Sequence, residues 1–89
     1  MKDTYLEVTF RHGRPMAAYY YLPRQTQDKS CRTKRIEPGL VIDFNQDGKP
    51  IGIEITAPSK ISLAIINRVL EDLGLPSVTQ GDLAPLTAA

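Results

Sequence analysis

The chain has a single cysteine, a single histidine and no tryptophan. Cys31 cannot form an internal disulfide, and no second cysteine or histidine lies at a spacing that would hold zinc with it. His12 lies beside Arg11 and Arg14 in an expected turn, without a carboxylate to orient a catalytic imidazole. We therefore predict no metal site, no cofactor and no catalytic residue, with His12 as a solvated surface side chain and Cys31 as a chemically inert one.

Long apolar runs and glycine-rich phosphate loops are also missing. Residues 1–5 reach an acid and then alternate, which leaves no apolar core for a signal peptide or a membrane-spanning helix. No nucleophile elbow or phosphate loop occurs. We therefore expect a cytoplasmic protein without a membrane partner or an identifiable small-molecule substrate, and a non-enzymatic role more than an enzyme.

The length of the chain limits the number of its domains, and its charge distribution bears on the kind of partner it could bind. At 89 residues it can build one compact core, and its 42% hydrophobic content is ordinary for a globular domain. Residues 1–35 carry eight Lys and Arg against three Asp and Glu, whereas residues 36–89 carry three against seven. Such a split is typical of proteins that bind nucleic acid or acidic partners, but the two halves of a folded domain can also cancel in space.

Alternating residues predict a first hairpin. Residues 4–10 and 16–22 alternate with the period of half-buried strands, and His12-Gly13-Arg14-Pro15 between them favours a turn. The polar residues 23–30 predict an exposed, mobile loop. Residues 31–36 predict a short, highly charged edge strand.

A second hairpin is predicted over residues 40–44 and 51–55, joined by Asn45-Gln46-Asp47-Gly48, with Gly48 in a left-handed conformation. We expect Ile42 to pair with Ile51 and Leu40 with Ile53. The apolar side chains then share one face of the sheet: Leu40, Ile42, Phe44, Ile51, Ile53 and Ile55.

Residues 60–73 carry apolar side chains at helical spacing, which predicts an amphipathic helix capped by Ser59 or Ser62 and ended by Gly74. Its apolar stripe must cover the apolar face of the second hairpin, which we call the isoleucine face. The predicted fold is α+β, an antiparallel sheet of four to five strands in two hairpins with one C-terminal amphipathic helix packed on one face. Residues 1–75 form a single domain in this interpretation, and residues 76–89 form a loosely ordered tail.

The segment Ile36–Ile55 resembles the signature of the YuzE-like family, a small bacterial domain of unknown function. A glycine-led strand ends in Asp43 and Phe44, enters an acidic turn and continues as Gly52-Ile53-Glu54-Ile55. The resemblance covers about residues 5–59 and departs from the pattern at Asn45 and Pro58. It implies an antiparallel sheet with a helix and no established activity. The resemblance also implies a location beside toxin genes for some members, and hence an antitoxin-like role as an alternative.

Two carboxylates, Asp43 and Glu54, are predicted on the outward face of the second hairpin. Facing carboxylates can perform acid–base chemistry or bind a hard cation, but calcium needs six or more oxygen ligands and a glycosidase pair needs a cleft. We interpret both residues as structural, with Glu54 paired to a neighbouring Arg or Lys.

Three tyrosines are predicted on the sheet face that the helix does not cover. Tyr5, Tyr19 and Tyr21, flanked by Arg32 and Lys34, suit contact with a protein, because aromatic rings bury area at low entropic cost. We therefore expect a non-enzymatic protein-interaction or regulatory module that acts as a homodimer or binds another small protein. The alternatives are an antitoxin-like partner of a small toxin, a sheet that stacks nucleic-acid bases, and a small enzyme with an unrecognised site.

Overall fold

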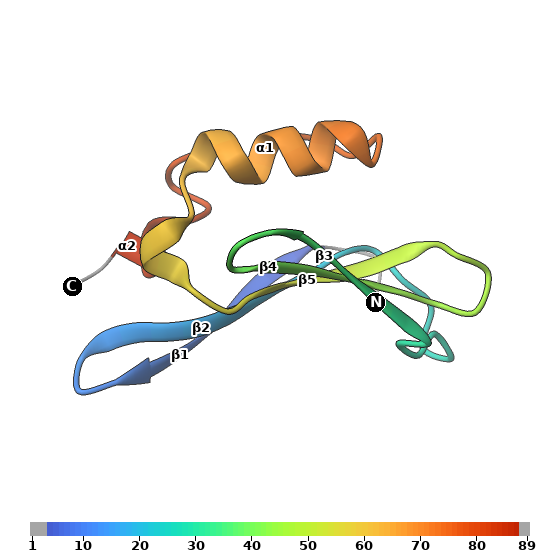
Figure 1. The fold of residues 1–89 in the computed structure, drawn as a ribbon, viewed down its shortest axis with the longest axis horizontal. Helices are drawn as coiled ribbons and strands as arrows, with labels where there is room; N and C mark the ends of the chain where they lie inside the picture. The colour runs from blue at the N-terminus through green and yellow to red at the C-terminus, as the bar shows by residue number, and fades with distance from the viewer. Residues whose placement is uncertain (1–3, 88–89) are drawn as a thin grey trace.

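The computed structural model describes residues 4–87, which form a five-stranded antiparallel sheet with helical segments on one side (Figure 1). The strand order is β1-β2-β5-β4-β3. The strands are β1 (Tyr5–Arg11), β2 (Arg14–Tyr21), β3 (Arg32–Glu37), β4 (Leu40–Phe44) and β5 (Pro50–Ile55). The predicted α+β class and the two hairpins are confirmed. β5 lies at the centre of the sheet, and β1 and β3 form its edges.

The hydrophobic core lies between the sheet and α1 (Leu63–Asp72). The predicted isoleucine face is confirmed, because Ile42, Ile53 and Ile55 are at most 1% exposed. Helix α1 covers this face with Ile66, Val69 and Leu70, all of them buried. The alternation of β2 adds further buried side chains: Ala18, Tyr20 and Leu22.

The predicted pairing of β4 with β5 is wrong by two residues. Ile42 lies opposite Ile53 and Leu40 opposite Ile55. The turn holds one residue more than expected, because Asn45 Oδ1 accepts the N–H groups of Asp47 and Lys49, each at 2.9 Å. A bulge between Asp43 and Phe44 takes up the remaining residue. A two-residue shift preserves the sheet faces, so the residues assigned to the covered face are buried as predicted except Phe44, which is half-buried.

The turns use glycine where the backbone requires a positive φ. Gly48 has φ +81°, as predicted. The first hairpin turns more tightly than expected, because His12 at φ 53° and Gly13 at φ 76° alone form the turn, and β2 already begins at Arg14. Two successive positive φ values match the right-handed twist of the paired strands.

The helix begins later than predicted. Pro58–Lys60 forms a separate 3₁₀ turn, η1, and Ile61 is extended, so α1 starts at Leu63 and not at Lys60. The Ser62 hydroxyl accepts a 3.2 Å hydrogen bond from the Ile65 N–H and caps the helix. Gly74, at φ 73°, follows the end of α1, as predicted.

The segment after α1 returns on the same side of the sheet and ends in a second short helix, α2 (Ala84–Thr87) (Figure 1). Although we expected a loosely ordered tail, Val78 and Leu83 are buried in the core cluster. The division of the chain at residue 75 stays a prediction. Within residues 4–87, no helix combines the length and apolar character needed to cross a membrane.

The polar loop between β2 and β3 is tied to the second hairpin. Asp28 accepts a 2.9 Å hydrogen bond from the Gln25 N–H and a 3.1 Å hydrogen bond from Asn45 Nδ2. These donors lower the pKa of the Asp28 carboxyl, the Gln25 N–H first. Asn45 is only 5% exposed, so its amide connects the loop to the β4–β5 turn from inside the molecule.

Candidate functional site: a tyrosine-bearing sheet face

The face of the sheet opposite α1 carries two rows of side chains that cross all five strands. Directly opposite residues on neighbouring strands project to the same side, so the pairing defines each row. One row runs from β1 to β3 through Glu7, Tyr19, Glu54, Val41 and Arg35. The next runs through Tyr5, Tyr21, Gly52, Asp43 and Thr33. We call these ten residues the tyrosine face.

The three tyrosines predicted to share this face come together. The rings of Tyr5 and Tyr21 stack with centroids 4.3 Å apart, and Tyr19 meets Tyr21 edge-on at 4.7 Å. The Arg24 guanidinium lies 5.2 Å from the centre of the Tyr21 ring. Tyr5 remains 45% exposed. The cluster is thus internally ordered and still presents aromatic surface to solvent.

Tyr19 lies flat across Gly52 and reaches Asp43. Its hydroxyl donates a 2.7 Å hydrogen bond to Asp43 Oδ2, and a β-carbon at position 52 would collide with the ring and hydroxyl of Tyr19. Burial of the phenol, followed by the hydrogen bond to Asp43, raises the pKa of Tyr19 well above its ordinary value. The phenol therefore stays protonated and serves as a fixed donor to the carboxylate.

Tyr21, also on β2, is held in a similar way by a residue of the edge strand β1. Its hydroxyl donates a 3.2 Å hydrogen bond to Glu7 Oε1. The pKa of Tyr21 is raised, first by a hydrogen bond with Tyr5 and then by partial loss of solvent and the charge of Glu7. The Tyr21 ring is thereby fixed between Tyr5 and Tyr19.

The two outward carboxylates lie on the tyrosine face, but in different surroundings. Asp43 is only 9% exposed, beneath the Tyr19 hydroxyl, whereas Glu54 is exposed. Among residues 4–87, no three His, Cys, Asp or Glu side chains gather where they could hold a metal ion. The Asp43 carboxylate accepts the Tyr19 hydrogen bond, which leaves Glu54 as the accessible acid at the centre of the face.

Arg32 and Lys34 do not flank the tyrosines, and this part of the prediction is wrong. They lie opposite Phe44 and Ile42, on the helix side of the sheet, where the Arg32 guanidinium lies 5.2 Å from the Phe44 ring centre. The cause is a bulge between Arg35 and Glu37, which places one additional residue in β3. Because side chains alternate along a strand, the residues of β3 before the bulge project to the opposite side from the one predicted. Arg35 takes the position on the tyrosine face instead.

The remaining singled-out side chains lie away from this face. His12 is exposed at the tip of the first hairpin, and Cys31 is exposed and forms no disulfide. Sequence reasoning missed Arg35 and also Asn67, a polar residue within the helix predicted over residues 60–73. Asn67 is half-buried and binds the backbone of Val78. Its low helix propensity in mid-helix was the available signal.

Part of this chain matches a known protein family. Residues 17–58 match a family described as protein of unknown function (DUF2283), and the match spans β3, β4, β5 and most of β2, including Tyr19, Gly52 and Asp43. Neither the curated proteins nor the solved structures yielded a match. The chain therefore resembles a small domain of unknown function, and the more specific YuzE-like name is not confirmed.

Proposed function

We propose that this chain is a protein-interaction module that acts through the tyrosine face, most simply by pairing with a second copy of itself. One observation carries the proposal. The sheet has two faces, and the helical segments of residues 4–87 all lie on the same one (Figure 1). No helical segment among the described residues covers the stacked tyrosines on the other face, and Tyr5 is 45% exposed.

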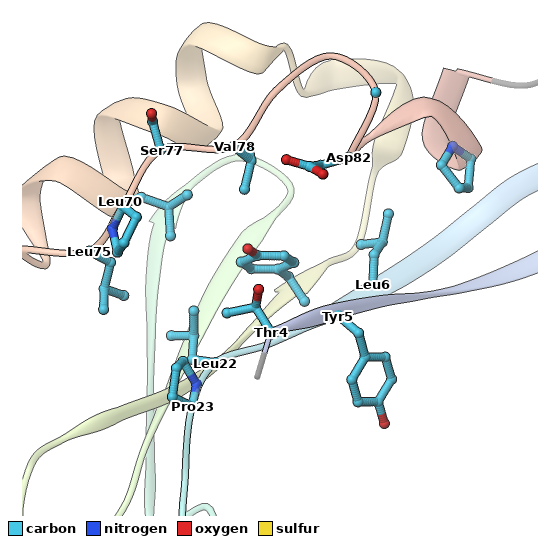
Figure 2. A pocket seen from close by; sticks show the side chains of 14 residues that line it. Thr4, Tyr5, Leu6, Leu22, Pro23, Leu70, Leu75, Ser77, Val78 and Asp82 are labelled. Atoms are coloured by element: carbon cyan, nitrogen blue, oxygen red, sulfur yellow. The ribbon is translucent and has the colours of Figure 1, made fainter. Parts of the chain in front are cut away.

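A C-terminal segment folded across the tyrosines would cover them without a partner. The segment instead packs on the helix side, because Val78 joins the same core cluster as Leu22 and Tyr20. Figure 2 shows that two neighbouring side chains of β1 point in opposite directions, Leu6 toward Val78 and Tyr5 away from it. The described part of the C-terminal segment therefore does not cover the tyrosines.

The tyrosine cluster has the physical properties of a binding surface. Tyrosine buries a large ring while its hydroxyl can keep a polar partner, which explains its enrichment at protein interfaces. The hydroxyls of Tyr19 and Tyr21 already have carboxylate partners within the chain. Because stacking and hydrogen bonds fix these rings before a partner arrives, little side-chain entropy is lost on association.

The charges on this face favour a second copy as the partner. Along one row, Glu7 lies on the edge strand β1 and Glu54 on the central strand β5. Arg35 lies on the opposite edge strand, β3. A two-fold axis that runs along the strands, between β4 and β5, reverses the strand order across the interface. Arg35 of each copy then lies opposite Tyr19 of the other copy and between its Glu7 and Glu54, and the symmetry repeats this contact, as an isologous interface requires.

The same acids argue against nucleic acid as the partner of this face. Phosphate backbones require basic side chains, yet Glu7 and Glu54 flank Tyr19 on either side. Lys34 and Arg32, the two cations expected beside the tyrosines, project from the opposite face. Base stacking on the tyrosines would therefore bring phosphates toward carboxylates.

Sedimentation over a wide concentration range tests the proposal. We expect the wild type to shift from monomer to dimer, and Tyr21→Glu to remain monomeric, because a charge at a desolvated aromatic anchor is costly. Met16→Glu is the matched control, since Met16 is 48% exposed but lies outside the tyrosine face. Equal masses for the wild type and Tyr21→Glu at every concentration would contradict self-association through this face.

A further inference from the structure

A cavity of about 480 Å³ lies on the helix side of the sheet, between β1, β2 and the segment that follows α1 (Figure 2). The sheet supplies Leu6, Tyr20 and the adjoining Leu22, and the end of α1 and its continuation supply Leu70, Leu75 and Val78. Cavities of this size commonly bind small organic molecules, and those sites are mostly apolar with a few polar groups.

The wall contributed by residues 75–85 is held in place by specific hydrogen bonds. The Asn67 side chain accepts from the Val78 N–H at 2.8 Å and donates to the Val78 carbonyl at 3.0 Å. This pair of bonds fixes the segment to the middle of α1. An anchored segment of the chain therefore forms this wall of the cavity.

Asp82 gives the cavity its electrostatic character. It is the one charged side chain among the described residues that line the space, and Figure 2 shows its carboxylate beside Val78. Its Oδ2 accepts a 2.9 Å hydrogen bond from the Thr79 N–H, and its own N–H donates to Thr79 Oγ1 at 3.2 Å. These bonds orient the carboxylate and occupy only one of its two oxygens among the described contacts.

We propose that this cavity binds a small organic amine, with an apolar body against the leucines and an ammonium group on Asp82. An ammonium forms a charge-assisted hydrogen bond with the carboxylate, which is stronger than a neutral one. A carboxylate ligand would face Asp82 with no cation in the described lining, and like charges repel. Thr4 and Ser77 add hydroxyl groups to the lining of the cavity.

A ligand series that varies only the polar group tests this inference by calorimetric titration. Phenethylamine, phenethyl alcohol and phenylacetate share an aromatic body and differ in being cationic, neutral and anionic. We expect phenethylamine to bind saturably and the alcohol about tenfold more weakly, because hydrogen bonds to charged groups are stronger. The acid should show the weakest binding. Equal binding of all three, or no binding of the amine, would overturn the proposal.

Two variants locate the binding. Asp82→Asn keeps an oxygen that can accept from the Thr79 N–H, so the turn is retained while the charge is lost. This variant should lose the preference for the amine over the alcohol. Asp72→Asn, which removes an exposed acid outside the cavity, is the matched control and should keep that preference. An amine preference that survives Asp82→Asn, or that Asp72→Asn abolishes, would contradict binding at this cavity.

Discussion

The Tyr19 hydroxyl donates a 2.7 Å hydrogen bond to Asp43 Oδ2 across the unsubstituted α-carbon of Gly52. Three strands meet in this contact, because Tyr19 comes from β2, Gly52 from β5 and Asp43 from β4. The contact fixes one of the three rings of the tyrosine face to the centre of the sheet. It also satisfies a buried carboxylate, which would otherwise be costly.

Substituting Gly52 tests this arrangement. Gly52→Ala should lower the free energy of unfolding by about 1 to 3 kcal/mol, because the added methyl group meets the Tyr19 ring and must displace it. Chemical denaturation measures the change. Gly81→Ala is the matched control, since its methyl group would meet only Thr79 Oγ1, at 3.7 Å. Equal denaturation midpoints for the two variants would show that the ring does not depend on Gly52.

The raised pKa of Tyr19 predicts how stability depends on pH. A phenol with a higher pKa in the folded chain holds its proton more tightly there, so its contribution is full below the ordinary value of 10.0. The contribution is lost as the pH rises from that value toward the folded pKa. The wild type should therefore lose stability faster above pH 10.0 than Tyr19→Phe, which has no phenol at this position. Parallel stability curves for the two proteins would contradict a stabilising hydrogen bond between Tyr19 and Asp43.

Asn67 should control the order of the segment after α1. Asn67→Ala removes both hydrogen bonds to Val78, and leaving those backbone groups unpaired costs about 1 to 3 kcal/mol. Amide hydrogen exchange should become faster in residues 76–86. Arg68→Ala, at the exposed neighbouring position, is the control and should leave exchange there unchanged. Unchanged protection in Asn67→Ala would show that apolar packing alone holds the segment.

The buried stripes could be predicted from the sequence because alternation and helical spacing report directly on burial. Ile42, Ile53 and Ile55 were assigned to the core face, and they lie there at 1% exposure or less. The left-handed Gly48 and Gly74 followed from turn and cap chemistry. These features depend on residues close together in the chain, and local patterns encode them.

The bulges could not be predicted in the same way. The additional residue between Arg35 and Glu37 reverses the faces of β3, and no residue type in that stretch signals it. Arg32 and Lys34 were consequently assigned to the wrong face, and Arg35 was missed. The tyrosines were assigned correctly because β2 pairs regularly with both of its neighbours between Ala18 and Tyr21.

Contacts between distant segments were the other source of error. Asn67 and Val78 lie eleven positions apart, and no periodicity connects a mid-helix amide with a residue in a proline-containing segment. Asn45 and Asp28 illustrate the same point, since their hydrogen bond joins a turn to a loop that we expected to be mobile. Such polar contacts arise only once the sheet and helix have placed these segments together.

Charge reversal tests most directly whether two copies meet through the tyrosine face. Arg35→Glu and Glu54→Arg should each weaken the dimer by about tenfold at low salt, because two symmetry-related ion pairs become repulsive. The double variant exchanges the two charges and should restore the wild-type dissociation constant, measured by sedimentation. A wild type that stays monomeric at every concentration would contradict the proposed pairing. So would a double variant whose loss of dimerisation free energy equals the sum of the losses in the two single variants.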